Sequence, residues 1–470
     1  MKIETLLFLT LIPFLFSCSK KPAEPTKPNI IYILADDLGY GDLGCFAQTT
    51  IQTPQLDNMA SQGIKFTDHY SGSTVCAPSR CTLMTGLHTG HARVRGNATA
   101  PLSPEDVTVA ELLHEAGYKT GLIGKWGLGE AGSTGVPNKQ GFDYFFGYLN
   151  QIKAHNYYPE YLWRNEEKVY LDNKVEIIQE TYAKGIGSVA REKNTHSHDL
   201  FTNEALKFIE TNKDSSFFLY LAYTIPHANN EGIPMGQIGM EVPDLGIYKD
   251  KDWPEAQKAH AAMITYLDKD VGAILMKLNE LKIDKNTLVI FTSDNGPHNE
   301  GGADPDFFDS NGKLKGMKRD LYEGGIRVPM IAWWPGRITG GMESNHISAF
   351  WDFLPTACEV GGVSIPATTD GVSFLPTLTG GDQKKHEYLY WEFMEKGGRQ
   401  GVRKHNWKAV KYDMSNNPHA PIQLFDLTSD IGEEHDLSGE HPKIVEEMEN
   451  IMKTARTPSD VFQFDYEKTE

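Results

Sequence analysis

The sequence predicts an α/β protein in which helices sandwich a large, mostly parallel sheet, followed by a smaller C-terminal α+β domain with an antiparallel sheet. Three observations support this prediction. Apolar runs rich in β-branched residues recur up to residue 382, helical patterns lie between them, and short strand-like segments follow one another from residue 383. Alternating strands and helices are typical of parallel sheets, whereas consecutive short strands are typical of antiparallel meanders.

Several apolar runs are expected to form the buried strands of the large sheet. Each is short and carries Ile, Val or aromatic side chains, which is typical of strands that are covered on both faces. They are NIIYILA from Asn29, KTGLIG from Lys119, FFLYLAY from Phe217, TLVIFTS from Thr287 and VPMIAWW from Val328.

Helical patterns between these runs are clearest in residues 103–118, 197–210 and 254–281. In the first of them Ser103 is the candidate N-cap, because its hydroxyl can accept a hydrogen bond from a free backbone N–H of the first turn. Pro104 then suits the first helical position, where no N–H is needed.

The last part of the chain is expected to fold as a small domain of its own. HEYLYWEF, RQGVRKHNWKAVKY and IQLFDL read as short strands of a meander, and HPKIVEEMENIMKTAR reads as a closing helix. We therefore expect a large domain over residues 29–382 and an antiparallel-sheet domain over residues 383–470.

The first residues predict export. A charged start leads into an apolar run over residues 6–16, which is too short to cross a bilayer and is typical of a secretory signal peptide over residues 1–17. The segment LFSC resembles the lipobox of bacterial lipoproteins. We therefore expect lipidation of Cys18, a tether over residues 18–28, and a periplasmic protein held to a bacterial membrane by that lipid alone. The alternative is an ordinary cleaved signal peptide, which also exports the chain.

Charge and cysteine content exclude some classes of partner and scaffold. The net charge of −18 argues against a nucleic-acid partner. An anionic substrate would also be repelled, so it would need cations gathered in one cleft. The cysteines besides Cys18 are too few for a disulfide scaffold, although Cys76 and Cys81 could pair with each other. They are Cys45, Cys76, Cys81 and Cys358.

Oxygen-bearing side chains follow two of the predicted strands. Asp36 and Asp37 come directly after the strand from Asn29, and Asp294 and Asn295 follow the strand from Thr287. Reactive groups collect at the carboxyl ends of strands in open α/β sheets, and carboxylate and amide oxygens suit Ca²⁺ or Mg²⁺ better than zinc. Each pair alone could be a simple turn, but together they favour a metal site.

Cationic side chains lie near the same strand ends. They are Arg80, Lys125, His227 and Lys318. A single lysine is usually just solvated, but a cluster would let an acidic protein bind an anion locally.

The segment CAPSRCTLMTG over residues 76–86 resembles the sulfatase signature C-x-P-S-R-x-x-L-x-T-G at every defined position. The resemblance continues, in the family's order, through ADD at 35–37, GKW at 124–126, PH at 226–227, SDNG at 293–296 and the segment 318–329. It implies an alkaline-phosphatase-like fold and a bacterial arylsulfatase or carbohydrate sulfatase that acts on a sulfated carbohydrate.

The resemblance also implies roles for the residues named above. A sulfatase-maturating enzyme would oxidise Cys76 to formylglycine, whose hydrate attacks sulfur and later expels sulfate. Ca²⁺, or Mg²⁺ as the alternative, would be held by Asp36, Asp37, Asp294, Asn295 and residue 76 itself. Arg80 would steady formylglycine, Lys125 and Lys318 would bind the sulfate oxygens, and His227 would protonate the leaving alcohol.

One position departs from the family pattern. The family usually reads G-K-W-H-L-G, and here Gly127 replaces the histidine that contacts the formylglycine hydroxyl. We expect His155, in the aromatic-rich segment 147–163, to fill the gap and to contact the sulfate or the sugar. The alternatives are that a water fills the gap, or that this segment is an ordinary surface loop and Gly127 marks a subsite widened for a bulkier sugar.

Two further residues and two other functions complete the expectations. Trp391 and Arg403 of the C-terminal domain are candidates for substrate contacts. A metal-dependent phosphodiesterase or phosphonate hydrolase of the same superfamily is one alternative function. A non-catalytic binder of sulfated glycans is the other, should Cys76 stay unmodified.

Overall fold

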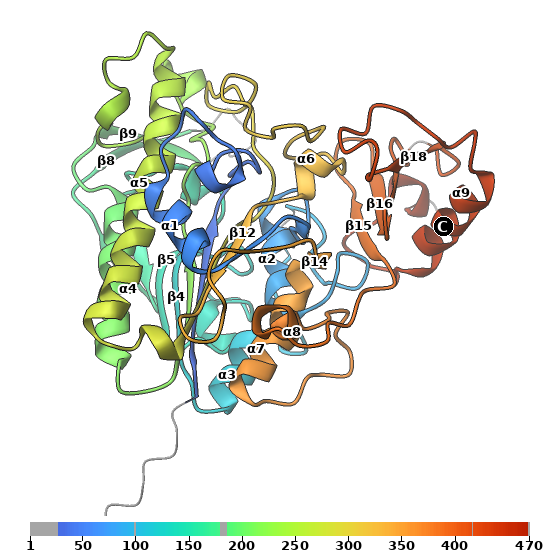
Figure 1. The fold of residues 1–470 in the computed structure, drawn as a ribbon. Coiled ribbons are helices and arrows are strands. Elements are labelled where there is room, and N and C mark those ends of the chain that lie inside the picture. The colour runs from blue at the N-terminus through green and yellow to red at the C-terminus, as the bar shows by residue number, and fades with distance from the viewer. Residues whose placement is uncertain (1–26, 98–99, 179–185, 416, 469–470) are drawn as a thin grey trace, which may run out of the picture.

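The computed structural model describes residues 27–97, 100–178, 186–415 and 417–468. The predicted signal peptide, Cys18 and most of the predicted tether lie outside these residues. A ten-stranded sheet forms the centre of the large domain, and a four-stranded sheet belongs to the C-terminal part (Figure 1).

The centre of the large sheet is parallel, as predicted. β1 (Asn29–Ala35) lies between β10 (Phe217–Ala222) and β11 (Thr287–Ser293), and β4 (Lys119–Lys125) and β5 (Tyr144–Tyr148) continue the parallel array beyond β10. All four carboxyl ends of β1, β10, β11 and β4 therefore reach the same edge of the sheet.

Antiparallel pairs occur toward both margins of the sheet, although the outermost pair on one side, β13 (Met342–Ser344) with β2 (Ile64–Phe66), is parallel. The run from Val328 forms β12 (Met330–Trp333), but it pairs antiparallel with β11, so this strand deviates from the parallel pattern. The other margin strands are β6 (Tyr161–Arg164) and β7 (Glu167–Tyr170). Two small two-stranded sheets join β3 (His69–Tyr70) with β14 (Ser348–Ala349), and β8 (Lys174–Ile177) with β9 (Ser188–Glu192).

Helices cover both faces of the sheet, and the alternation of side chains along β1 explains why. Ile31 and Ile33 face one apolar core, whereas Ile30 and Leu34 face the other. One core is closed by α1 (Pro54–Gln62), α4 (Ser197–Asn212) and α5 (Glu255–Glu280), and the other by α2 (Cys76–Thr85), α3 (Val109–Glu115), α7 (Phe353–Gly361) and α8 (Leu375–Thr379) (Figure 1).

The prediction that Ser103 caps a helix is wrong. The helix α3 begins later, because Thr108 and Glu111 form a capping box: Glu111 N donates to Thr108 Oγ1 (3.2 Å) and Thr108 N donates to Glu111 Oε2 (2.8 Å). Ser103 instead belongs to a turn, in which its backbone N–H donates to Asp106 at 2.8 Å.

Short helices occupy the connections. These are α6 (Glu323–Ile326) and the 3-10 turns η1 (Gly44–Phe46), η2 (Pro137–Lys139), η3 (Lys153–His155), η4 (Ile233–Met235), η5 (Gly246–Tyr248), η6 (Asp284–Asn286), η7 (Phe350–Asp352) and η8 (Asp465–Glu467). Within the described part of the chain, no helix is both long and apolar enough to cross a bilayer.

The C-terminal part is the predicted antiparallel meander with a closing helix. The strands follow one another in the sheet in chain order, and α9 (Pro442–Thr454) packs Met448, Ile451 and Met452 against one face. The other face packs on the large domain through a cluster that includes Trp391, Trp351 and Tyr70. The strands are β15 (Leu389–Phe393), β16 (Arg399–Lys404), β17 (Trp407–Lys411) and β18 (Ile422–Asp426).

Candidate active site

Three carboxylates and an amide meet at the carboxyl ends of β1 and β11, as their positions in the sequence predicted. Because the two strands are neighbours, Asp37 N donates to Asp294 Oδ1 (3.1 Å) and Asn295 Nδ2 donates to Asp37 Oδ1 (2.7 Å). Oxygens of Asp36, Asp37 and Asp294 all lie within 4.8 Å of one another, and the side chains have no exposed surface.

This centre fits a hard divalent cation. Asp36 Oδ1 and Asn295 Oδ1 are buried and have no hydrogen-bond partner. Burial and the Asp36 carboxylate raise the pKa of Asp294 to about 7, since one more negative charge is unfavourable there. Buried oxygen atoms without partners, crowded together in this way, are the donor set that Ca²⁺ and Mg²⁺ prefer.

Two cations, Arg80 of α2 and Lys125 of β4, contact the carboxylates of the centre. Arg80 Nη2 contacts Asp36 Oδ2 (3.1 Å) and Asp294 Oδ2 (2.9 Å), and Arg80 Nη1 donates to the Lys125 carbonyl (2.8 Å). Lys125 Nζ lies 2.6 Å from Asp36 Oδ2. Both predicted cations are therefore held against the metal-type centre, with almost no exposed surface.

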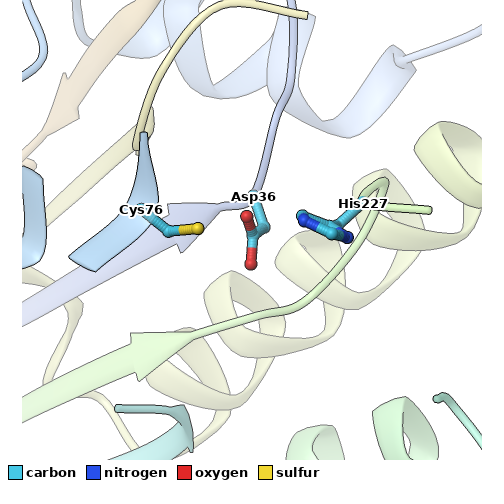
Figure 2. A group of neighbouring side chains, drawn as sticks. All are labelled: Asp36, Cys76 and His227. Carbon is cyan, nitrogen blue, oxygen red and sulfur yellow. The ribbon is translucent and has the colours of Figure 1, made fainter. Parts of the chain in front are cut away.

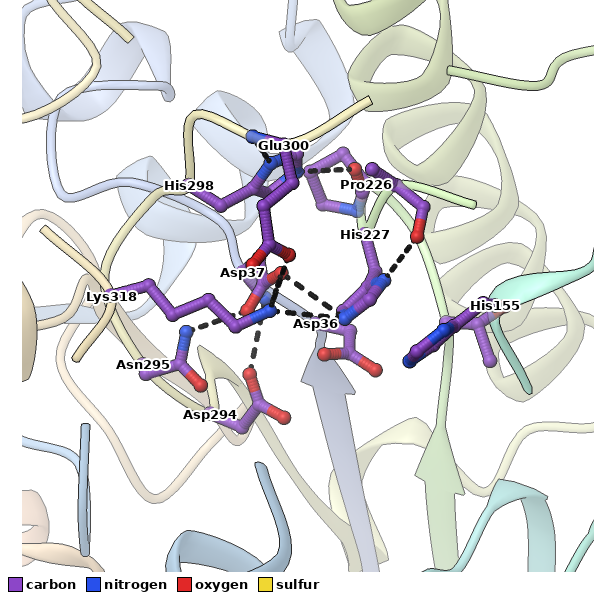
Figure 3. Close-up of polar contacts among 12 residues, drawn as sticks. Asp36, Asp37, His155, Pro226, His227, Asp294, Asn295, His298, Glu300 and Lys318 are labelled. Atoms are coloured by element: carbon purple, nitrogen blue, oxygen red, sulfur yellow. Dashed lines mark hydrogen bonds and ion pairs between the residues drawn. The ribbon is translucent and has the colours of Figure 1, made fainter. Parts of the chain in front are cut away.

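Lys318 and His227 lie next to each other and close to Asp37 (Figure 3). Lys318 Nζ contacts Asp37 Oδ2 (2.8 Å), His227 Nε2 (3.1 Å) and Glu300 Oε2 (3.0 Å). Burial would lower the pKa of Lys318, but the carboxylates of Asp37 and Glu300 outweigh burial and raise it.

His227 is held as a neutral imidazole of one tautomer. Its Nδ1 lies 2.6 Å from the Ala228 carbonyl, which can only accept, so Nδ1 carries the proton and Nε2 accepts from Lys318. Burial, and then the positive charge of Lys318, hold the pKa of His227 well below its usual range.

Cys76 faces this centre from the first turn of α2. Its sulfur, an Asp36 oxygen and a His227 nitrogen lie within 4.8 Å of one another, and Figure 2 shows the three side chains converging from separate segments. The side chain is buried, and burial raises the pKa of the thiol. The unmodified residue is therefore a protonated thiol and a poor nucleophile. Cys81, one turn and a half along the same helix, is a free core cysteine.

His155 reaches the centre beside His227. Its ring stacks on His227 with centroids 4.7 Å apart, and its Nδ1 lies 3.1 Å from Glu231 Oε2. A Cβ at Gly127 would meet Gln151, at 3.5 Å, and the hypothesis that His155 takes the role of the missing histidine stays a prediction. The segment that carries His155 is thus no mere surface loop, and its contact with substrate stays a prediction.

The two candidates of the C-terminal domain lie at the domain junction. Trp391 packs within an apolar cluster and donates its indole N–H to Ser71 O (3.0 Å), so the prediction of a sugar contact by this ring is wrong. The Arg403 guanidinium contacts Asp68 Oδ1 (2.7 Å) and the Tyr70 hydroxyl, which gives it a role in holding the domains together rather than at the acidic centre.

Sequence reasoning missed two acidic residues, Glu231 and Glu300. Each lies in a loop after a strand end and holds a histidine or lysine of the centre. A signal existed, because the loops 226–232 and 297–301 both read Pro-His followed by Asn-Glu-Gly. The repeated pattern at two strand ends could have indicated paired positions for carboxylates.

Comparisons with known proteins agree with this geometry. The family model described as Sulfatase matches residues 28–363, and that described as N-sulphoglucosamine sulphohydrolase, C-terminal, matches residues 316–457. The N-acetylgalactosamine-6-O-sulfatase of Bacteroides thetaiotaomicron is 31% identical over 95% of this chain and 97% of its own length. The N-acetylgalactosamine-6-sulfatase of Mus musculus is 32% identical over 78% of this chain and 69% of its own. The solved structure of Ps i-CgsB in complex with k-i-k-neocarrahexaose has a TM-score of 0.75 and 28% identity, covering 94% of this chain and 96% of that one.

Proposed function

The chain belongs to the sulfatase family and is a sulfuric ester hydrolase with an alkaline-phosphatase-like fold, and from that premise we propose that it removes sulfate from carbohydrates using Ca²⁺ and a formylglycine made from Cys76. The observation that carries the proposal is the convergence of Cys76, Asp36 and His227 in one buried cluster beside oxygen atoms that lack partners.

The charges of the cluster explain how an acidic protein attracts sulfate. Asp36, Asp37 and Asp294 are balanced by Arg80, Lys125 and Lys318, and Glu300 beside Lys318 is balanced by Arg319, so a bound divalent cation would make the cluster positive by two charges. Bound there, Ca²⁺ would polarise a sulfate oxygen and lower the pKa of the nucleophile. The site would thus be locally positive in a protein of net charge −18.

The residue at position 76 supplies the covalent chemistry once it is modified. Formylglycine hydrate carries two hydroxyls on one carbon, one to attack sulfur and one to release the product by re-forming the aldehyde. Lys125 contacts Asp36 and Lys318 contacts Asp37, and their ammonium groups would bind the sulfate oxygens as negative charge develops.

The hydrogen bonds of His227 indicate which group holds the proton for the leaving alcohol. Because Nδ1–H is held by Ala228 and Nε2 accepts from Lys318, the proton on this side of the site resides on the Lys318 ammonium. We assign the Lys318 ammonium as the general acid that gives this proton to the bridging oxygen, while His227 Nε2 holds the ammonium in place by accepting its hydrogen bond.

The substrate class rests on the relatives. Their names specify sulfated N-acetylgalactosamine for two enzymes, and Ps i-CgsB was solved in complex with k-i-k-neocarrahexaose. A sulfated carbohydrate is therefore the substrate class that we propose for this chain.

Two measurements test the proposal. Peptide mass spectrometry of protein made beside a maturating enzyme is expected to find formylglycine at position 76. Turnover of an aryl sulfate is expected to exceed that of the matched aryl phosphate. Full activity with an intact thiol overturns the nucleophile, faster phosphate cleavage supports a phosphohydrolase, and sugar binding without turnover supports a glycan-binding protein.

Export and anchoring remain part of the proposal. A chain with a signal peptide and a lipid on Cys18 would work in the periplasm, attached to a membrane. Mass spectrometry of the N-terminal peptide of protein purified from membranes is expected to find an acylated Cys18, and an unmodified, cleaved N-terminus would instead support free periplasmic protein.

A further inference from the structure

A cavity of about 170 Å³ lies beside Gly127. It is smaller than the ~300–1,000 Å³ of typical drug-sized ligand sites, so it has room for part of one sugar and not for an oligosaccharide. We call it the Gly127 pocket. Its polar and glycine lining consists mainly of Asn97, Gly127, Glu130, Ser133, Asn150 and Gln151.

The Gly127 pocket adjoins the nucleophile. The backbone N–H of Ala77, the residue after Cys76, is directed at Asn97 Oδ1 (3.4 Å), and Gln151 Nε2 donates to the Asn97 carbonyl (3.2 Å). Gly127 follows Lys125 by two positions, and its N–H donates to Leu149 O (3.0 Å). A sugar whose sulfate contacts Lys125 would therefore extend toward this pocket.

The backbone of Gly127 explains why the space is open. Its φ is +84°, a conformation that residues with a Cβ rarely adopt. A Cβ built there would meet Gln151 at 3.5 Å and 3.7 Å, which is ordinary contact, so the side chain would point into the pocket. The missing side chain thus leaves a volume in front of Gln151.

The lining offers acceptors and a negative charge. Gln151 Oε1 and Ser133 Oγ are buried without a hydrogen-bond partner. Among the described lining residues the ionisable side chain is Glu130, which accepts a hydrogen bond from Asn150 Nδ2. Free acceptors favour a ligand with O–H or N–H donors, and a carboxylate beside them disfavours a second anion.

We propose that the Gly127 pocket receives the neutral, hydroxyl- or acetamido-bearing part of the sulfated sugar, and that Glu130 rejects sugars with a second sulfate or a carboxylate there. This inference rests on the proposed function, because it takes the sulfate to be bound between Lys125 and Lys318. The donors of the sugar pair with Gln151 Oε1 and Ser133 Oγ, which otherwise stay without partners.

The first experiment measures binding without turnover. In full-length Cys76→Ala protein supplied with calcium, calorimetry compares N-acetylgalactosamine 6-sulfate with its 4,6-disulfate. The monosulfate is expected to bind roughly 10-fold more tightly, and Glu130→Gln in the same background should remove most of that preference, because it removes a charge a few ångströms from the ligand. The exposed Glu166→Gln is the matched control and should leave the preference unchanged.

The second experiment fills the pocket. Gly127→Asn is expected to weaken monosulfate binding at least about 10-fold by occupying the space before Gln151. Gly132→Asn is its control, since Gly132 has nearly the same φ of +85° but is exposed, and a Cβ at that position would meet nothing within 4 Å. Comparison of the two variants separates loss of the pocket from backbone strain.

The outcomes distinguish this inference from the proposed function. An unchanged preference in Glu130→Gln, or equal binding by Gly127→Asn and Gly132→Asn, overturns the Gly127 pocket. Failure of the Cys76→Ala protein to bind either sugar, while matured wild-type enzyme cleaves an aryl sulfate, also overturns the pocket and leaves the sulfatase chemistry standing. The expected affinities without any turnover of sulfate by matured enzyme would uphold the pocket and refute the function.

Discussion

Two regions of this molecule bury many charges, and they use them differently. At the carboxyl edge of the sheet lies the active-site cluster, and between the large domain and the C-terminal sheet lies the junction network. Each combines three carboxylates with three cations. The active-site cluster comprises Asp36, Asp37, Asp294, Arg80, Lys125 and Lys318, and the junction network comprises Asp68, Glu323, Glu433, Arg327, Arg403 and Lys408.

The difference lies in what surrounds the oxygen atoms without hydrogen-bond partners: in the junction network Glu433 Oε1 still faces Lys408 Nζ at 3.8 Å, whereas Asp36 in the active-site cluster lies beside Cys76. In the junction network Glu323 uses both oxygens: Oε1 accepts from Lys408 (2.8 Å), and Oε2 accepts from Tyr70 (2.6 Å) and Arg327 (3.2 Å). In the active-site cluster Asp36 Oδ2 contacts two cations, Arg80 and Lys125, whereas Asp36 Oδ1 has no hydrogen-bond partner. Equal counts of charge therefore do not identify a site, whereas unsatisfied oxygens that converge with a nucleophile do.

The largest expected effect concerns the nucleophile. Cys76→Ala should lower kcat at least about 1,000-fold, as loss of a nucleophile does in other hydrolases, and leave the thermal unfolding temperature nearly unchanged. Cys81→Ala, in the same helix and equally buried, is the control and should retain activity. Steady-state assays with an aryl sulfate measure both, and similar losses in the two variants would contradict the assignment.

Replacing a lysine should lower activity in the active-site cluster and stability in the junction network. Lys125→Met and Lys318→Met should each reduce kcat roughly 100- to 1,000-fold, because they remove charge that faces the developing sulfate anion. Lys408→Met should instead lower the free energy of unfolding by about 3–5 kcal/mol, because it leaves Glu433 and the Oε1 atom of Glu323 buried without the cation that they share.

Urea unfolding and assays on the folded enzyme separate these two effects. An effect of Lys125→Met or Lys318→Met on KM alone would mean that these groups only anchor the substrate.

Calcium should stabilise one region only. At a free concentration 100-fold above its Kd, a bound ion adds about 2.7 kcal/mol to the free energy of unfolding. Chelation should remove this increment together with the activity. Asp37→Ala should abolish the calcium-dependent shift of the unfolding temperature, while Asp68→Asn in the junction network should preserve it. A shift that survives in Asp37→Ala would place the ion elsewhere.

The smallest expected effect concerns unpartnered atoms outside both regions. His260, in α5, is buried with no partner at either ring nitrogen, and burial, followed by His298, lowers its pKa to about 3. Since the unfolded chain binds a proton near pH 6.5 and the folded chain does not, stability falls as the pH drops from about 6.5 toward 3, by up to about 1.4 kcal/mol per pH unit.

His260→Gln should flatten that slope, and the exposed His405→Gln should not. Urea unfolding at pH 7 and pH 5 measures the slopes. Equal slopes in the two variants would show that His260 is already protonated in the fold.

The fold could be predicted where burial imposes a strong pattern. The bounds of β1 agree residue for residue with NIIYILA, because a strand covered on both faces needs a continuous apolar run. The antiparallel direction of β12 depends on the path of the loop before it, which no periodicity specifies. The strands β6 to β9 were missed because strands with one solvated face, such as β7 and β8, carry exposed Lys and Glu rather than apolar runs.

The site shows the same division. Asp36, Asp37, Asp294 and Asn295 could be placed together, since the ends of parallel strands must meet. The other positions depend on how the domains pack together. Trp391, for example, would be an exposed ring on the C-terminal sheet if the domain junction did not bury it.

The burial of α2 limits when Cys76 can be modified. All ten of its residues are buried, including Pro78 and Arg80, which the proposed maturating enzyme would have to read. The elements η7 and α7, which pack on α2, come far later in the chain. Cys76 would therefore leave the ribosome well before the segments that bury it. The oxidation that we propose for Cys76 must therefore finish while this segment is still a loose, newly made stretch of polypeptide, and a variant that folds faster would emerge with less of its nucleophile.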